Sequence, residues 1–183
     1  MQRGFLSNNM REQRLIAQTQ NGDRDAFEHL VEPYVKALFN YVMFRVNNVS
    51  DANDIIQETM FSIWQSIGSY EHGASFKTWA FSIARRRLAD FYRKNKKHNS
   101  LPLTDFENIF PEKDPHNESI DRMDIDKALS HLNNNENELV YLIFQAGLSY
   151  QEISVVMGIP VGTVKSRMAS IKSKLRILLS GEG

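Results

Sequence analysis

A basic segment near the end of the chain has the residue types and the spacing that DNA contacts require. From Val161 to Arg176 there are five basic residues and no acidic residue. Lysine, arginine and hydroxyl side chains bind phosphate oxygens, and those near the start of a helix can reach base edges in the major groove. We therefore expect a DNA-contacting face here, in preference to a merely solvated basic helix. Its candidate residues are Thr163, Lys165, Ser166, Arg167, Ser170 and Lys172.

The local sequence predicts a helix-turn-helix that would position this face. Ser149 and Glu152 have the spacing of a capping box, so a helix should begin just after Ser149 and end at Gly158. The Gly-Ile-Pro sequence at 158–160 fits the short turn of the motif. The second helix should bury a stripe of apolar residues spaced by three and four. This stripe comprises Val161, Val164, Met168, Ile171, Leu175 and Leu178.

A second segment combines aromatic and basic side chains. Residues 75–79, Ser-Phe-Lys-Thr-Trp, lead into three consecutive arginines at 85–87 and then into Phe-Tyr-Arg-Lys at 91–94. Aromatic rings can stack on unpaired bases while cations follow the phosphate backbone, so the segment could hold single-stranded DNA. A packing role is the alternative for Phe76 and is favoured for Trp79, because aromatic residues at helical spacing usually belong to a core. Arg86 and Arg93 are harder to place in a core.

Charge is balanced overall but sorted along the chain. There are 22 basic and 22 acidic residues, which disfavours tight DNA binding by the chain alone, because phosphate contacts supply much of that affinity. Residues 85–97 hold seven basic residues and one acidic residue, a net charge of +6. Residues 105–126 hold eight acidic residues and two basic ones, a net charge of −6. Two basic stretches separated by an acidic one indicate nucleic-acid contact at two places.

Composition also excludes several classes of protein. The chain has no cysteine, which excludes disulfides, thiolate zinc sites and a cysteine nucleophile. We find no His-centred triad, phosphate-binding glycine loop or metal-ligand cluster, and so expect no enzyme, no metal and no cofactor. Residues 1–20 lack the apolar core of a signal peptide, and no apolar run approaches the roughly 18 residues of a membrane span. We therefore expect a cytoplasmic protein without membrane insertion.

The periodicity predicts an all-α fold with two helical domains. The first helix should begin near Asp23 or Asp25, and Pro33 should break or kink it. A second helix should follow Ser50 as N-cap and stop at Gly68. The remaining helices are expected at about 76–94, 123–132, 136–146 and in the helix-turn-helix.

The expected domains follow from where this periodicity fails. Three of the five prolines lie in one acidic stretch, which predicts a flexible acidic linker. The divisions are an N-terminal extension at 1–20, a first domain at 21–95, the linker at 96–122 and a second domain at 123–183.

Taken together, these motifs resemble the extracytoplasmic-function group of bacterial sigma factors, in the sigma-70 family. The resemblance covers nearly the whole chain from about Gly22. Each motif is moderately specific, but four of them in family order with an intervening linker are a strong signal. The matching segments are Gly-Asp at 22–23 with Ala-Phe at 26–27, Asp-Ala-Asn-Asp-Ile-Ile-Gln-Glu at 51–58, Ser-Phe-Lys-Thr-Trp at 75–79 with Ile83-Ala84 and Asp90, and Ile-Pro-Val-Gly-Thr-Val-Lys-Ser-Arg at 159–167.

The resemblance implies two helical domains, sigma domain two and sigma domain four, with no domain three between them. In this family, domain two grips the β′ coiled coil of core RNA polymerase, reads the minus-ten element and helps to open it. Domain four binds the β flap and reads the minus-thirty-five element. The implied partners are thus core RNA polymerase and promoter DNA, with an anti-sigma factor, common in the family, as a further partner.

The resemblance also implies roles for particular residues. The polymerase-binding set, which would otherwise look like an ordinary solvated helical face, is Asp51, Asp54, Gln57 and Glu58. The minus-ten set is Ser75, Phe76, Lys77, Trp79, Arg86, Asp90 and Arg93. The minus-thirty-five set is the six-residue DNA-contacting face described above. The loop 69–75 matches the segment that captures a flipped minus-ten base, and the acidic linker matches the segment threaded toward the RNA exit path.

Two departures from the family pattern affect the expected promoter sequence. Arg86 stands where the family often has Asn, and an arginine has longer reach and no acceptor. Ser170 and Lys172 stand where the family often has Arg, and Ser170 weakens any inference of a bidentate guanine contact. The promoter sequence therefore cannot be transferred from relatives.

Three other functions compete with a sigma factor. A stand-alone helix-turn-helix regulator would usually be a dimer on two half-sites, and the chain shows no dimerisation heptad. It would also leave the basic aromatic segment unexplained. A sigma-like decoy for an anti-sigma factor should lack an intact recognition helix, which this chain has. An enzyme is the least favoured.

Overall fold

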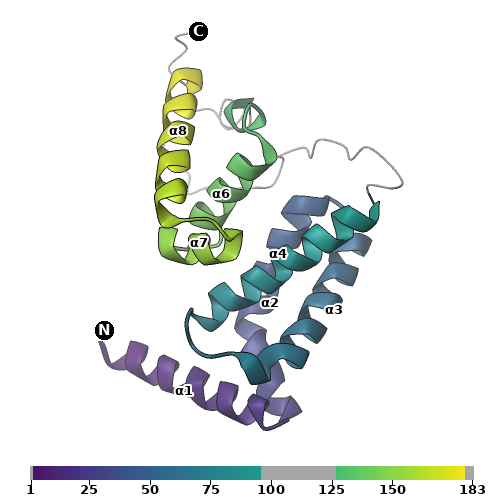
Figure 1. Cartoon of the computed structure of the whole chain (residues 1–183). Helices are drawn as coiled ribbons and strands as arrows, with labels where there is room; N and C mark the ends of the chain where they lie inside the picture. The colour runs from purple at the N-terminus through teal and green to yellow at the C-terminus, as the bar shows by residue number, and fades with distance from the viewer. Residues whose placement is uncertain (1, 96–126, 180–183) are drawn as a thin grey trace, which may run out of the picture. The chain divides into compact units, whose positions relative to one another are not determined.

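The structure, a computed structural model, describes residues 2–95 and 127–179 and the side chains from Asn9 onward. The regular elements in these ranges are all helices, which fall into two compact units, Met1–Ser100 and Leu101–Gly183 (Figure 1). The predicted all-α class with two helical domains is confirmed. Within the described ranges, no helix has the length and apolar character needed to cross a membrane. The acidic linker expected at 96–122 lies outside the described residues.

The first unit is built on three helices that pack against one another. These are α2 (Arg24–Val46), α3 (Val49–Ser66) and α4 (Phe76–Asn95), with a 3₁₀ turn, η1 (Ile67–Ser69), after α3. Their shared core contains large side chains with at most 2% of their surface exposed: Leu30, Leu38, Tyr41, Ile63, Phe76 and Phe81. Burying each such side chain stabilises the fold by about 1.5–3 kcal/mol, so this core fixes how the surfaces of α3 and α4 are presented.

An additional helix, α1 (Gln2–Gln20), packs on α2 and contacts η1. Ile16 and Thr19 of α1 are buried, with 1% and 2% of their surface exposed. The sequence analysis set residues 1–20 apart as an extension and did not anticipate this packing. The reason is that the segment is mostly polar, and its contacts are made with residues distant in the sequence.

Helix α2 begins where expected but is not broken at Pro33. Asp23 is the N-cap, and its carboxylate accepts a hydrogen bond from the Ala26 N–H at 3.0 Å. Pro33 lies inside the helix, which continues to Val46, so of the two expected effects the break is wrong and the kink stays a prediction. An interior proline costs about 3 kcal/mol, and packing of α2 against α1, α3 and α4 outweighs that cost.

The N-cap of α3 is Asn48, so the prediction of Ser50 is wrong. The Asn48 side chain accepts a hydrogen bond from the Asp51 N–H at 3.0 Å. Asn47, just before it, has a φ of 49°, a left-handed conformation that asparagine tolerates better than most residues. The two asparagines therefore make the whole connection between α2 and α3, and Ser50 falls in the first helical turn.

The second unit contains a helical turn at 127–130 and the helices α6 (Asn134–Phe144), α7 (Tyr150–Met157) and α8 (Val161–Leu179). Of the helix expected at 123–132, residues 123–126 lie outside the described part. Helix α6 starts two residues before the expected Glu136, because Asn133 forms a capping box with Glu136. The fully buried side chains of the second unit include Leu139, Leu142, Ile153 and Ile171.

Candidate nucleic-acid interface

The helix-turn-helix is formed by α7 and α8, as the sequence predicted. The capping box is present: Ser149 Oγ accepts from the Glu152 N–H at 3.3 Å, and Glu152 Oε2 accepts from the Ser149 N–H at 2.9 Å. Gly158 ends α7 with a φ of 65°, a left-handed conformation that glycine adopts without steric cost. The chain then enters α8 after Pro160, so both ends of the turn are fixed by local residues.

Helix α8 divides into a buried stripe and an exposed basic face. Val164, Met168 and Ile171 are buried, with at most 2% of their surface exposed. Five of the six predicted contact residues are exposed, and the sixth, Thr163, is half-buried. The exposed five are Lys165, Ser166, Arg167, Ser170 and Lys172. The side chains predicted to meet DNA thus point away from the core, which is the geometry a recognition helix needs.

The predicted buried stripe does not extend to the end of α8. Leu175 is half-buried, and Leu178 is exposed over 40% of its surface. The helices that cover α8, α6 and α7, have 11 and 8 residues, too few to bury one face of a 19-residue helix. The prediction that Leu178 is buried is therefore wrong, because periodicity does not show how far a neighbouring helix reaches.

A cross-helix ion pair fixes the second half of α8. Lys174 Nζ donates to Glu136 Oε1 at 2.5 Å, and Glu136 Oε2 accepts from the Asn133 N–H at 3.0 Å. Burial alone would raise the pKa of Glu136, but the hydrogen bonds from Lys174 and Asn133, with the lysine charge, lower it below 4.5. Lys174 therefore acts within the unit, although the sequence shows it as one more cation of the basic face.

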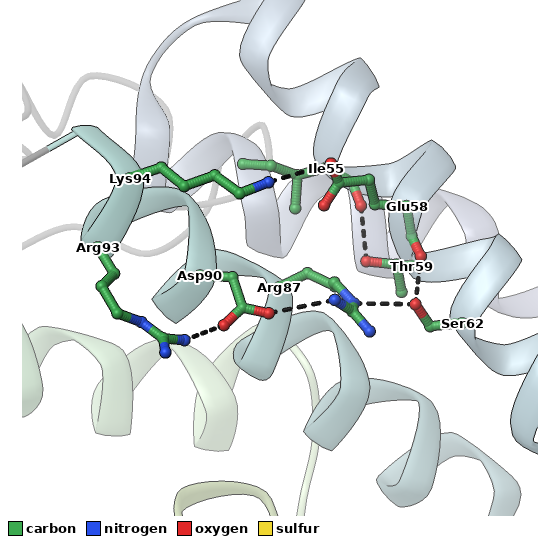
Figure 2. A network of polar contacts seen from close by, with 8 residues as sticks. All are labelled: Ile55, Glu58, Thr59, Ser62, Arg87, Asp90, Arg93 and Lys94. Atoms are coloured by element: carbon green, nitrogen blue, oxygen red, sulfur yellow. Dashed lines mark hydrogen bonds and ion pairs between the residues drawn. The ribbon is translucent and has the colours of Figure 1, made fainter.

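The predicted polymerase-binding residues lie on the outer side of α3. Asp54, Gln57 and Glu58 are exposed and Asp51 is half-buried, whereas Ala52, Ile55, Ile56 and Thr59 face the core. Glu58 makes a 3.9 Å ion pair with Lys94 of α4 (Figure 2). Phe61, which the sequence analysis missed, is 65% exposed. The signal that could have found it is its spacing of four residues after Gln57, which continues the same helical face.

An aromatic cluster lies at the start of α4, and Phe76 is its centre. The Phe76 side chain is fully buried, and its ring centroid lies 5.6 Å from that of Tyr34, 6.0 Å from Tyr70 and 5.8 Å from Trp79. The prediction that Phe76 contacts DNA is therefore revised, because its ring is occupied by packing. Trp79 is half-buried, which agrees with the packing role favoured for it and leaves part of its ring accessible.

The loop before α4 is closed on itself. Tyr70 is 7% exposed, and its hydroxyl donates to the Ala74 carbonyl at 2.6 Å, which ties the two ends of the loop together. Ser75 then accepts a hydrogen bond from the Thr78 N–H at 3.2 Å and so caps α4. The residues between these anchors, Glu71, His72 and Gly73, are exposed. The loop is thus anchored at both ends and presents its middle to solvent.

A polar network joins α4 to α3 (Figure 2). Arg87 donates to Ser62 Oγ at 2.9 Å and to Asp90 Oδ2 at 3.1 Å, and Arg93 pairs with the other oxygen of Asp90. Asp90 is only 23% exposed, while Arg93 is 76% exposed. Both carboxylate oxygens of Asp90 are thus engaged by arginines, and its predicted contact with DNA stays a prediction. Arg87 was missed as a link between the helices, because its partner on α3, Ser62, is 25 residues away in the sequence.

The remaining predicted residues of this surface are accessible to different extents. Arg86, Arg93 and Ser75 are exposed, and Lys77 is half-buried. Trp79, Arg86 and Arg93 are spaced by seven residues, so they share one side of α4 and form a basic and aromatic surface, whereas Lys77 lies on another side of the helix. This surface and the acidic face of α3 lie on adjacent helices of one unit.

Comparison with protein families assigns both units. Residues 30–98 match the family model "Sigma-70 region 2", and residues 122–175 match "Sigma-70, region 4". A curated relative, the "ECF RNA polymerase sigma factor SigM" of Mycobacterium tuberculosis, is 28% identical over 165 residues, which cover 90% of this chain and 83% of that protein.

Two solved structures have a similar fold. The sigma factor RpoE of Bartonella quintana, solved with the anti-sigma factor NepR, is 25% identical and has a TM-score of 0.62, covering 84% of this chain and 96% of that one. CnrH, solved with the cytosolic domain of CnrY, is 22% identical, with a TM-score of 0.67 and coverage of 94% and 99%. At that identity the similarity to CnrH concerns the fold alone.

Proposed function

Because this chain belongs to the sigma-70 family, in the extracytoplasmic-function group, we propose that it binds core RNA polymerase, directs it to specific promoters and helps to melt the minus-ten region. The observation that carries this function is the presence of two DNA-suited surfaces in one chain. One is the exposed basic face of α8 within a helix-turn-helix, and the other is the basic and aromatic surface of α4.

The second unit reads the minus-thirty-five element. Its proposed contacts are the six residues predicted on α8, of which five are exposed and none is used by the core. The start of α8 enters the major groove, so Thr163, Lys165 and Ser166 meet base edges or the nearest phosphates. The same unit attaches to the β flap. We place this domain at residues 123–183 and the linker at 96–122.

The first unit attaches to polymerase through α3. The acidic and amide face at Asp51, Asp54, Gln57 and Glu58 grips the β′ coiled coil, and Phe61 adds an exposed apolar contact on the same face. Phenylalanine is among the residue types that are enriched at protein interfaces relative to the rest of the surface. We place this domain at residues 21–95, with α1 packed upon it.

The first unit also opens the minus-ten element. Extruding a base from duplex DNA costs a few kcal/mol, which stacking and edge contacts must offset. The anchored loop at 69–75 and the accessible part of Trp79 supply a pocket wall, and Ser75, Lys77, Arg86 and Arg93 supply polar and cationic contacts. Phe76 and Asp90 act behind this surface, one by packing and the other by orienting Arg93.

The setting of the protein follows from these partners. The chain acts where polymerase and chromosome are, so we place it in the cytoplasm, as a specificity subunit without catalysis of its own. Because RpoE of Bartonella quintana was solved with an anti-sigma factor, we also propose an anti-sigma protein as a regulatory partner.

Reconstitution tests this function. The purified chain is added to core RNA polymerase and to a pool of DNA fragments with randomised promoter regions, and the run-off transcripts are sequenced. The proposed function predicts co-elution with core polymerase and transcripts that select two sequence elements. If the chain neither co-elutes nor stimulates selective transcription, it is not a working sigma factor.

A further inference from the structure

The side chain of Gln20, the last residue of α1, binds the start of the loop that precedes α4. Its amide Nε2 donates to the Ile67 carbonyl at 3.0 Å and to the Tyr70 carbonyl at 3.2 Å. Ile67 is the first residue of η1 and Tyr70 follows its last, and the amide has two N–H groups, one for each carbonyl. A single side chain from a helix 47 residues earlier thus bridges the turn from which the loop departs.

Tyr70 is the residue through which this bridge reaches the loop. Its ring centroid lies 4.8 Å from that of His72 and 5.0 Å from that of Trp79, and its hydroxyl closes the loop on Ala74. His72 has a left-handed φ of 57°, which is uncommon for a residue other than glycine. Fixing the Tyr70 backbone therefore fixes the base of an exposed loop with a constrained conformation.

A second contact from α1 supports the other side of the same cluster. The Tyr34 hydroxyl on α2 hydrogen-bonds Glu12 of α1, and the Tyr34 ring packs on Phe76 at 5.6 Å. Burial, reinforced by the Glu12 carboxylate, raises the pKa of Tyr34, so this hydroxyl stays a donor. Helix α1 therefore holds the loop directly through Gln20 and holds its aromatic floor through Glu12 and Tyr34.

We propose that α1 is a positioning element for the minus-ten loop, and that Gln20 is its principal positioning residue. This inference rests on the proposed function, because it assigns the loop to base capture. A pocket that receives a flipped base must be formed before the base arrives, since ordering it afterwards would add to the cost of extrusion. Gln20 lies outside the pocket and does not contact DNA, but its two hydrogen bonds hold the loop in place before the base arrives.

The test uses the full chain with core polymerase and a promoter selected in the reconstitution above. Gln20→Ala removes both hydrogen bonds, and Gln20→Glu keeps the size of the side chain but cannot donate. Gln20 is exposed as a residue, so neither change leaves a cavity. The control is Gln13→Ala, an exposed glutamine on the same helix. The measurements are affinity for core polymerase and affinity of the holoenzyme for single-stranded minus-ten DNA.

Both Gln20 variants should weaken binding of the single strand by about tenfold, because the lost hydrogen bonds no longer order the loop before binding. Core affinity and the Gln13→Ala control should stay unchanged. An abasic scan of the strand then locates the effect. At the position of the captured base, removing the base should make wild type and Gln20→Ala bind the strand with equal affinity. The reason is that neither protein can then make the contact between the loop and that base.

Three results would overturn the inference. They are equal single-strand binding by Gln20→Ala and wild type, an equal loss of core affinity, or a defect that no abasic position removes. The last two would show a general structural role. Failure of the wild-type chain to direct transcription would instead reject the proposed function, and that result is independent of every Gln20 variant.

Discussion

At the scale of residues, the side chains assigned to DNA differ from those that hold them in place. Lys165 and Arg86 are exposed, whereas Phe76 and Asp90 are engaged with neighbouring side chains. Substituting a residue of the first kind should change DNA binding and leave folding intact. Substituting one of the second kind should change both. This difference makes the exposed residues the cleaner tests of function.

Lys165→Ala should weaken binding of a minus-thirty-five duplex by the holoenzyme. The melting temperature of the protein chain itself should not change. The expected loss is about 1 kcal/mol or more, and the dependence of log K on log salt should become shallower by about one. Lys127→Ala is the matched control, because it removes one exposed positive charge from the same unit. Filter binding across a salt series measures both quantities. Equal behaviour of the two variants would remove Lys165 from the site.

Arg86→Ala should slow promoter opening about tenfold, as expected when a base or phosphate contact worth about 1–3 kcal/mol is lost. Binding to core polymerase should not change, since Arg86 lies outside the α3 face. Lys36→Ala is the control, an exposed cation on α2. Opening is followed by permanganate reactivity of minus-ten thymines. A wild-type opening rate in Arg86→Ala would show that this arginine does not act in melting.

At the scale of elements, the recognition helix is held by local signals at one end and by a distant pair at the other. The capping box and the Gly158 turn set the start of α8, while Lys174 and Glu136 tie its second half to α6. Fixing both ends matters for a recognition helix, because the angle between this helix and the rest of the unit decides which bases it reaches.

The Glu136–Lys174 pair should make the stability of α8 depend on pH. The pKa of Glu136 is lowered in the folded chain, so its stabilisation is fully present above 4.5 and is lost as pH falls through the lower folded value. Lys174→Ala should therefore accelerate hydrogen exchange of α8 amides at pH 7, and the difference from wild type should shrink as pH falls through the lowered pKa of Glu136. A difference that is constant with pH would mean that the ion pair contributes nothing.

Pro33→Ala should stabilise the first unit by about 1–3 kcal/mol. Alanine restores a backbone N–H inside α2 and removes the proline ring from the preceding turn, which stabilises the folded helix. This stabilisation exceeds the cost of the greater conformational entropy that alanine gives to the unfolded chain. Both tryptophans, Trp64 and Trp79, lie in this unit, so their fluorescence during urea unfolding reports it. Val35→Ala serves as the control on the same helix. A lower stability for Pro33→Ala would mean that α2 depends on the proline.

What could be predicted from the sequence depended on how local the determinant was. The capping box at Ser149 and the stripe through Ile171 involve neighbours within a few residues, and both were predicted correctly. The contact of Gln20 with Ile67 and the burial of Phe76 against Tyr34 depend on helices brought together by folding. No periodicity signals such contacts, which is why the packing of α1 and the burial of Phe76 emerged only from the structure.

At the scale of the whole molecule, the chain combines two DNA-suited surfaces with a net charge of zero. The balanced charge of the whole chain disfavours strong independent DNA binding, because phosphate contacts by cations supply much of that affinity. Attachment to polymerase makes the second DNA contact effectively intramolecular once the first has formed, so two weak contacts act together. We therefore expect the protein to read promoters well only as part of a larger enzyme.

The most direct test of this claim is the binding of the chain to a selected promoter duplex with and without core polymerase, at one salt concentration. The account predicts weak, non-selective binding by the free chain and tight, selective binding by the holoenzyme. It also predicts that Lys165→Ala and Arg86→Ala each reduce the selectivity of the holoenzyme. Equally tight and selective binding by the free chain would contradict the account and identify a stand-alone helix-turn-helix regulator.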